Sequence, residues 1–95
     1  MSGPRPVLIV DDDPALRATL SEQLSLDGEF AVHEAGTAEQ AEHALLEPSA
    51  RYDAVLLDIG LPDGNGRDLC AKLRRDGVRV PIIMLTGADG ESDVV

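Results

Sequence analysis

The chain has few of the residues that nucleic-acid binding requires. It contains no tryptophan, and Tyr52 and Phe30 are its only large aromatic residues, so no platform exists for stacking single-stranded bases. Eighteen acidic residues stand against eight basic ones, and the resulting net charge of −10 argues against contact with a phosphate backbone. We therefore expect no direct binding of nucleic acid by this chain.

Cysteine and long apolar runs are also scarce. Cys70 is the only cysteine, so no internal disulfide can form, which fits a reducing compartment. Its neighbours Leu69 and Leu73 indicate a packing residue rather than a reactive thiol. The first apolar run, Val7–Val10, is too short for a signal peptide or a membrane span. We predict a cytoplasmic protein with no membrane partner.

The composition is that of one small globular domain. The 95 residues are 43% hydrophobic and 27% charged. Apolar runs alternate with amphipathic stretches, a pattern typical of parallel strands joined by helical crossovers. The predicted strands are Val7–Val10, Phe30–Val32, Ala54–Leu57 and Pro81–Leu85, with helices after Pro14, Thr37 and Gly66.

The remaining segments are predicted to be less regular. Residues 1–6 are expected to form a flexible N-terminal segment. The loop Gly60–Gly66 is too rich in glycine and proline to predict regular structure. Residues 87–95 are predicted to begin as a loop and the first turn of a helix.

Carboxylates gather at the predicted carboxyl ends of strands. Asp11 and Asp12 follow the first apolar run, and Asp58 and Thr86 follow later ones, so the sheet should bring them to one crevice. Carboxylates in such a place repel one another unless a cation or a proton lies between them. Mg²⁺ prefers oxygen ligands and would allow one carboxylate to attack a phosphoryl donor. Asp13, which precedes a proline, is better explained as a helix cap.

Three motifs occur together, VLIVDDDPALR, VLLDIGLPDGNG and PIIMLTG. With them the chain resembles the receiver domain of two-component response regulators. The resemblance implies an α/β fold, a doubly wound parallel sheet of the flavodoxin-like receiver type. Its strand order here would be 2-1-3-4, with the fifth strand and last helix missing. Residues 1–95 would then be a single receiver domain that is incomplete at its C-terminus.

The resemblance also implies a role for each residue of the crevice. Asp58 would accept a phosphoryl group from a sensor histidine kinase or a phosphotransfer protein. Asp12 would bind Mg²⁺ directly, Asp11 through water or by assisting, and Asp58 and the backbone carbonyl of Gly60 would complete the protein ligands. Thr86 would be the switch hydroxyl. Such a protein is a phosphorylation-dependent switch rather than an enzyme, with at most slow self-catalysed phosphotransfer and dephosphorylation.

The family pattern is not complete in this chain. A lysine at the end of a fifth strand has no counterpart, since the only lysine, Lys72, is predicted on the outside of the third helix. Without a fifth strand, Ile82–Leu85 would be a bare apolar edge that favours aggregation. We favour a fragment of a longer protein. The alternative is a homodimer or swapped dimer in which another chain completes the domain.

Two other functions stay open. A degenerate receiver would never be phosphorylated and would act only as a docking module, against which the intact acidic set argues. A Mg²⁺-dependent phosphatase would use Asp11 as nucleophile and Asp13 as general acid. Pro14 and the capping role of Asp13 argue against that alternative.

Overall fold

The computed structural model describes residues 3–85 and 92–94. Within them, the five-stranded main sheet has the order β2-β1-β3-β6-β7, and its first four strands are parallel. The predicted α/β fold with its parallel order is therefore confirmed. The strands of this sheet are β1 (Arg5–Val10), β2 (Phe30–Ala35), β3 (Ala54–Asp58), β6 (Ile82–Leu85) and β7 (Ser92–Val94).

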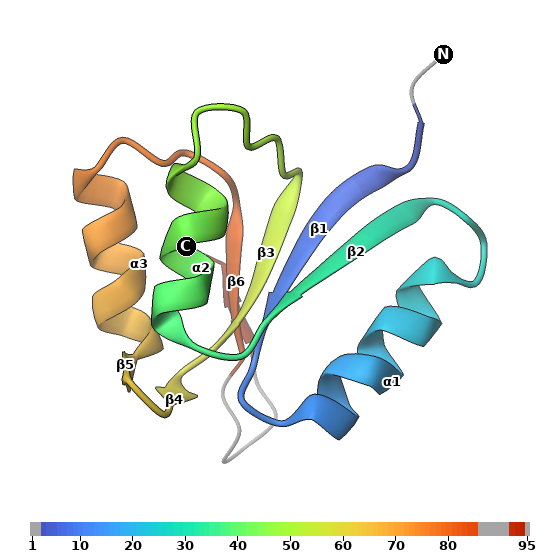
Figure 1. Ribbon diagram of the computed structural model, residues 1–95, viewed down its shortest axis with the longest axis horizontal. Coiled ribbons are helices and arrows are strands. Elements are labelled where there is room, and N and C mark those ends of the chain that lie inside the picture. The colour runs from blue at the N-terminus through green and yellow to red at the C-terminus, as the bar shows by residue number, and fades with distance from the viewer. Residues whose placement is uncertain (1–2, 86–91, 95) are drawn as a thin grey trace.

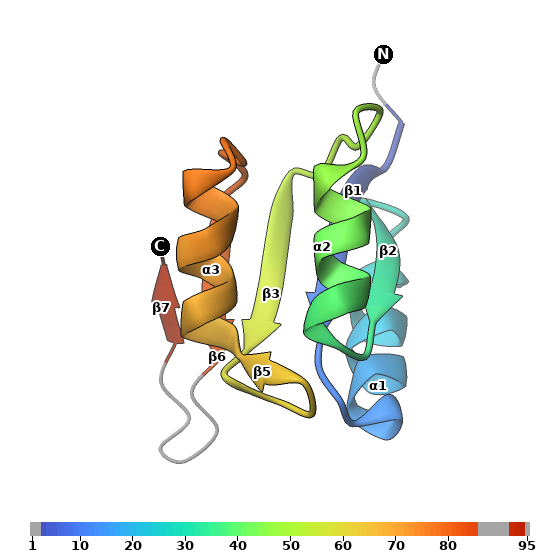
Figure 2. The same ribbon diagram turned by 60° about the vertical axis from the view of Figure 1, so that its left-hand side comes forward.

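Helices cover both faces of this sheet. Helices α2 (Ala38–Leu46) and α3 (Gly66–Arg75) lie side by side on one face, and α1 (Pro14–Ser25) lies on the other (Figures 1 and 2). The main core fills the α2 and α3 side, because alternate strand residues point toward those helices. The largest of its fully buried side chains are Leu8, Val10, Val55, Leu57, Leu73, Ile82 and Met84.

Helix α1 begins where the sequence predicts. The Asp13 carboxylate accepts hydrogen bonds from the amides of Ala15 (3.0 Å) and Leu16 (3.3 Å), and Pro14 occupies the first turn. The apolar stripe of this helix packs only in part. None of its side chains is fully buried, and that of Leu16 is 40% exposed.

Helix α3 follows the prediction closely. Leu69, Cys70 and Leu73 are buried, so the cysteine is a packing residue. Lys72 lies on the outside, where its Nζ is 2.8 Å from Oε2 of Glu42 in α2. This ion pair joins the two helices across the surface of their layer.

The N-terminal boundary differs from the prediction. Strand β1 begins at Arg5, so the predicted strand start at Val7 is wrong. The flexibility of residues 1–6 stays a prediction. The amide of Arg5 donates to Glu29 (2.8 Å), and the carbonyl of Pro6 accepts from Asp53 (2.7 Å). Proline cannot donate a ladder hydrogen bond, but its carbonyl can still accept one, so the strand continues through it.

The far edge of the sheet also differs. Ser92–Val94 is a strand rather than the predicted start of a helix, and it pairs antiparallel with β6, with Ile83 opposite Val94 and Leu85 opposite Ser92. The predicted bare edge at Ile82–Leu85 is therefore wrong. Unpaired amide and carbonyl groups at an edge favour any neighbouring strand that can satisfy them.

No helix in the described part of the chain is both long and apolar enough to cross a membrane.

Candidate functional site

The acidic residues of β1 and β3 meet at the carboxyl edge of the sheet. Asp11 and Asp12 directly follow β1, and Asp58 ends β3. The two strands are neighbours in parallel register, with Val10 opposite Leu57. As a result, one carboxylate oxygen from each of Asp11, Asp12 and Asp58 lies within 4.8 Å of the others. We call these three residues the acidic cluster.

The cluster has an inner and an outer side. Asp11 is only 4% exposed, Asp58 is half-buried and Asp12 is exposed. Burial raises the pKa of Asp11, against the effect of a hydrogen bond from the Asp13 amide to its Oδ1 (2.9 Å). The negative charges of Asp58, Asp12 and Asp13 raise this pKa further.

The donor set of the cluster suits a hard divalent cation. It consists of carboxylate oxygens, and one side of it is open to solvent, so water could complete an octahedron. A cation there would offset the repulsion that raises the Asp11 pKa. Mg²⁺ therefore fits the residues present.

Replacing Asp11 by asparagine should stabilise the metal-free protein. Because the pKa of Asp11 is higher in the folded state than in the unfolded state, ionisation costs stability as the pH rises above the ordinary value. The asparagine side chain would keep an oxygen for the Asp13 amide and remove the charge. We expect the free energy of unfolding at pH 7 to rise by on the order of 1 kcal/mol.

Urea denaturation in the presence of a chelator measures this effect. The gain of Asp11→Asn should shrink as the pH is lowered and the wild-type carboxyl becomes protonated. Asp27→Asn, which changes an exposed carboxylate outside the cluster, is the matched control and should show no comparable gain. A variant no more stable than the wild type at pH 7 would contradict the prediction.

The loop after Asp58 is more regular than predicted. Strands β4 (Gly60–Leu61) and β5 (Gly64–Asn65) form a small antiparallel hairpin, so the expectation of an irregular loop is wrong. At its base the amide of Gly66 donates to the carbonyl of Ile59 (2.7 Å), and the side chain of Leu61 is buried. Gly60, whose carbonyl is a predicted metal ligand, opens this hairpin.

Gly66 allows the hairpin to close onto β3. A Cβ atom at Gly66 would overlap the carbonyl oxygen of Asp58 and lie 3.0 Å from Cα of Ile59. Only a residue without a side chain permits that approach. The backbone at the phosphoacceptor candidate is thus packed directly against the start of α3.

Two polar residues near the cluster were missed by sequence reasoning. Arg17 of α1 donates through Nη1 to the carbonyl of Asp11 and through Nε to Glu34 Oε1 (3.1 Å). Asp63 at the hairpin tip binds the start of α2. Both residues lie within the quoted motifs, Arg17 at the end of VLIVDDDPALR and Asp63 within VLLDIGLPDGNG, but Glu34 and the start of α2, to which they bind, are distant in sequence. The motifs therefore contain the two residues but do not indicate these contacts.

The predicted switch hydroxyl, Thr86, lies outside the described residues. The preceding residue Leu85 is in parallel register with Asp58, so β6 ends beside the cluster. The role of Thr86 stays a prediction.

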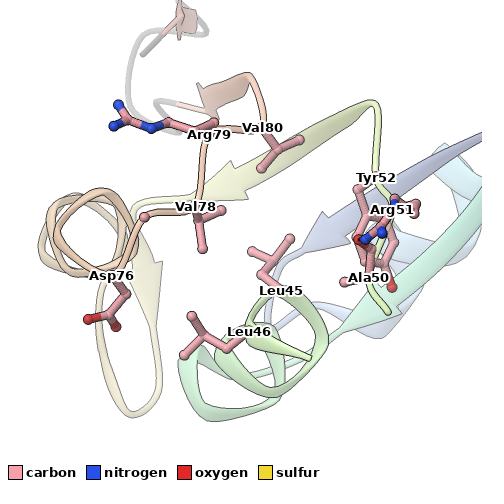
Figure 3. Close-up of a pocket in the computed structure, with 10 residues that line it drawn as sticks. Leu45, Leu46, Ala50, Arg51, Tyr52, Asp76, Val78, Arg79 and Val80 are labelled. Atoms are coloured by element: carbon pink, nitrogen blue, oxygen red, sulfur yellow. Dashed lines mark hydrogen bonds between the residues drawn. The ribbon is translucent and has the colours of Figure 1, made fainter. Parts of the chain in front are cut away.

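A separate hollow of about 370 Å³ lies at the amino ends of β3 and β6, opposite the carboxyl ends that carry the acidic cluster (Figure 3). It is formed by the segments that lead into β3 and β6 and by the end of α2. It contains no residue of the acidic cluster and forms no part of the candidate site. Its lining residues are Leu45, Leu46, Ala50, Arg51, Tyr52, Asp76, Gly77, Val78, Arg79 and Val80.

Proteins of known sequence can be aligned with most of this chain. It is 37% identical over 94 residues to the transcriptional regulatory protein TcrA of Mycobacterium tuberculosis, covering 98% of this chain and 35% of TcrA. It is 45% identical over 89 residues to the DNA-binding response regulator MtrA of Mycolicibacterium smegmatis, covering 94% of this chain and 37% of MtrA. The chain thus spans about a third of the length of these curated relatives.

Solved structures share the fold and the same family. The response regulator TrrA of Thermotoga maritima in complex with Mg(2+)-BeF has a TM-score of 0.79 and 32% identity, over 90% of this chain and 71% of TrrA. TrrA in complex with the histidine kinase ThkA has a TM-score of 0.78 and 32% identity, over 87% of this chain and 69% of that chain. Residues 7–95 match the family description of the response regulator receiver domain. With its sheet order and sequence in agreement, this chain belongs to the response regulator receiver domain family.

Proposed function

We propose that this receiver domain is a phosphorylation-dependent switch in which Asp58 accepts a phosphoryl group. The donor would be a sensor histidine kinase or a phosphotransfer protein in the cytoplasm. The observation that carries the proposal is the convergence of three carboxylates from β1 and β3 within 4.8 Å. The complex of TrrA with a histidine kinase supports a partner of this kind.

Asp58 is suited to act as the nucleophile. It stands at the end of a strand that is paired on both sides, so its backbone is held firmly, and its side chain is half-buried rather than covered. In the proposed step a carboxylate oxygen bonds to phosphorus while the bond from phosphorus to the donor histidine nitrogen breaks. The product is an aspartyl phosphate and a free imidazole.

The other residues of the site would bind the metal ion and orient the phosphoryl group. Asp12, Asp58 and the carbonyl of Gly60 would bind Mg²⁺, with Asp11 acting through water or assisting. When bound, the ion would neutralise the cluster so that an anionic phosphoryl group can approach it. Thr86 is proposed to donate its hydroxyl to the new phosphate, whose added charge of about −2 favours a nearby donor.

The same geometry speaks against a phosphatase. The Asp13 carboxylate accepts from two amides of α1, so it is engaged as a cap and not poised as a general acid. The proposed module therefore accepts one phosphoryl group and loses it slowly, without sustained turnover.

Incubation with acetyl phosphate and Mg²⁺ tests the proposal. We expect intact-mass spectrometry to show the addition of one phosphoryl group, and a chelator to prevent it because the cluster would keep its full negative charge. Absence of any addition, in a protein that also carries the family's fifth strand and its lysine, would overturn the phosphoacceptor assignment and favour the degenerate docking module. Addition that is unaffected by the chelator would overturn the role of Mg²⁺.

A further inference from the structure

Asp63 joins two parts of the chain that are distant in sequence. Its Oδ1 accepts from the amide of Ala38 (2.7 Å), and its Oδ2 accepts from the amide of Glu39 (3.0 Å). These are the first two amides of α2, which have no partner within the helix. The two hydrogen bonds lower the pKa of the Asp63 carboxyl, so it is charged at neutral pH.

The start of α2 has a second, independent cap. Thr37 Oγ1 accepts from the amide of Gln40 (3.1 Å), three residues further along the chain. Thr37 belongs to the chain segment that leads into α2, whereas Asp63 belongs to the hairpin after Asp58. The two residues thus stabilise the same helix end, but only Asp63 also restrains the hairpin.

The hairpin needs such a restraint. Its strands have two residues each, and a ribbon this short is not stable by itself in water. Its base is held where Gly66 approaches Asp58 and Ile59. Its tip is held by Asp63. Gly60 lies between these two attachments, in register with Asn65.

We infer that Asp63 is a positioning residue for the metal site, because its link to α2 holds the hairpin that carries the Gly60 carbonyl beside the acidic cluster. The inference rests on the proposed function, in which that carbonyl binds Mg²⁺. The hydrogen bonds described for Asp63 go to the start of α2 and not to the acidic cluster. It acts through the backbone of the hairpin.

The expected effect is a loss of Mg²⁺ affinity. Residues that orient metal ligands from outside the coordination sphere are usually worth at least tenfold in affinity, so Asp63→Ala should weaken Mg²⁺ binding about tenfold. Asp63→Asn keeps one oxygen acceptor and loses the charge, so its Mg²⁺ affinity should lie between that of the wild type and that of Asp63→Ala. Thr37→Ala removes the other cap of α2 and should leave Mg²⁺ affinity unchanged.

Titration with Mg²⁺, followed by the amide NMR signals of the hairpin, provides a readout that does not depend on phosphorylation. The matched pair is Asp63→Ala and Thr37→Ala, both of which remove a cap of α2. If the wild type fails to bind Mg²⁺, the proposed function itself falls. If the wild type binds but Asp63→Ala binds equally well, or is weakened no more than Thr37→Ala, the positioning role is overturned.

A second variant covers the case in which Asp63→Ala does not fold. Asp63→Asn then carries the comparison, since asparagine accepts a hydrogen bond at the same place. Amide hydrogen exchange at Ala38 and Glu39 should accelerate in either variant relative to the wild type. Unchanged exchange together with unchanged Mg²⁺ affinity would also contradict the inference.

Discussion

Asp58→Asn is expected to abolish phosphoryl uptake from both acetyl phosphate and a phosphorylated histidine kinase. The amide of asparagine has nearly the shape of the carboxylate but is a far weaker nucleophile, so no acyl phosphate forms. The substitution leaves the core untouched because Asp58 is half-buried at the end of β3. Intact-mass spectrometry should find the variant unmodified, with a circular dichroism spectrum like that of the wild type.

Asp13→Asn is the matched control for this experiment. It changes the aspartate next to the cluster in sequence, and asparagine caps helices as well as aspartate does. We expect uptake to be retained in Asp13→Asn. Phosphorylation that survives Asp58→Asn would mean that another residue is the acceptor.

Gly66→Ala is expected to have the largest effect on stability. The new Cβ would overlap the carbonyl oxygen of Asp58, and both this atom and Cα of Ile59 belong to the backbone. Backbone atoms in a paired strand cannot rotate away as a side-chain end can, so the hairpin or the start of α3 must move. We expect a loss of roughly 3 kcal/mol in the free energy of unfolding, the upper end for an overpacked site.

Gly64→Ala provides the comparison within the same hairpin. A Cβ there would meet only Cβ of Ala38 at 3.9 Å, an ordinary van der Waals distance. Urea denaturation should place Gly64→Ala near the wild type and Gly66→Ala far below it. Equal stability of the two variants would mean that the hairpin backbone accommodates the new Cβ at little cost, and it would contradict the prediction. Phosphoryl uptake should fall in Gly66→Ala as well, because the displaced backbone is that of Asp58.

The position of the acidic cluster could be predicted from the sequence. Apolar runs that end in Asp11 and Asp58 imply adjacent strand ends, because parallel strands of one sheet share a carboxyl edge. The cap at Asp13 was equally accessible, since the residue that starts a helix bonds to amides only two and three positions away. Both inferences depend on local patterns that survive in any packing of the chain.

The contacts that support the cluster could not be predicted in this way. Asp63 bonds to amides 24 and 25 residues earlier, and Arg17 bonds to Glu34 across 17 residues. Such pairs exist only after the sheet has placed the elements, and exposed charged residues elsewhere in the sequence look the same. Tertiary packing also explains the hairpin. Its glycine-rich sequence favours an irregular loop, and the hairpin forms because Gly66 packs against the end of β3.

The end of the described chain shows a similar limit. Ser92–Val94 carries too few residues for a periodic signal, and its strand conformation comes from pairing with β6. The start of β1 at Arg5 is likewise set by hydrogen bonds to Glu29 and Asp53, which lie in other connections. The bounds of these two strands are thus decided by their partners and not by local propensity.

The hairpin after Asp58 links α2 and α3 at their amino-terminal ends. It is fastened to the start of α2 through Asp63 and to the start of α3 through Asn65, whose Oδ1 accepts from the amide of Arg67 (2.7 Å). Farther along, Lys72 and Glu42 tie the two helices together. A displacement of the backbone next to Asp58 is therefore expected to act on the amino-terminal ends of both helices.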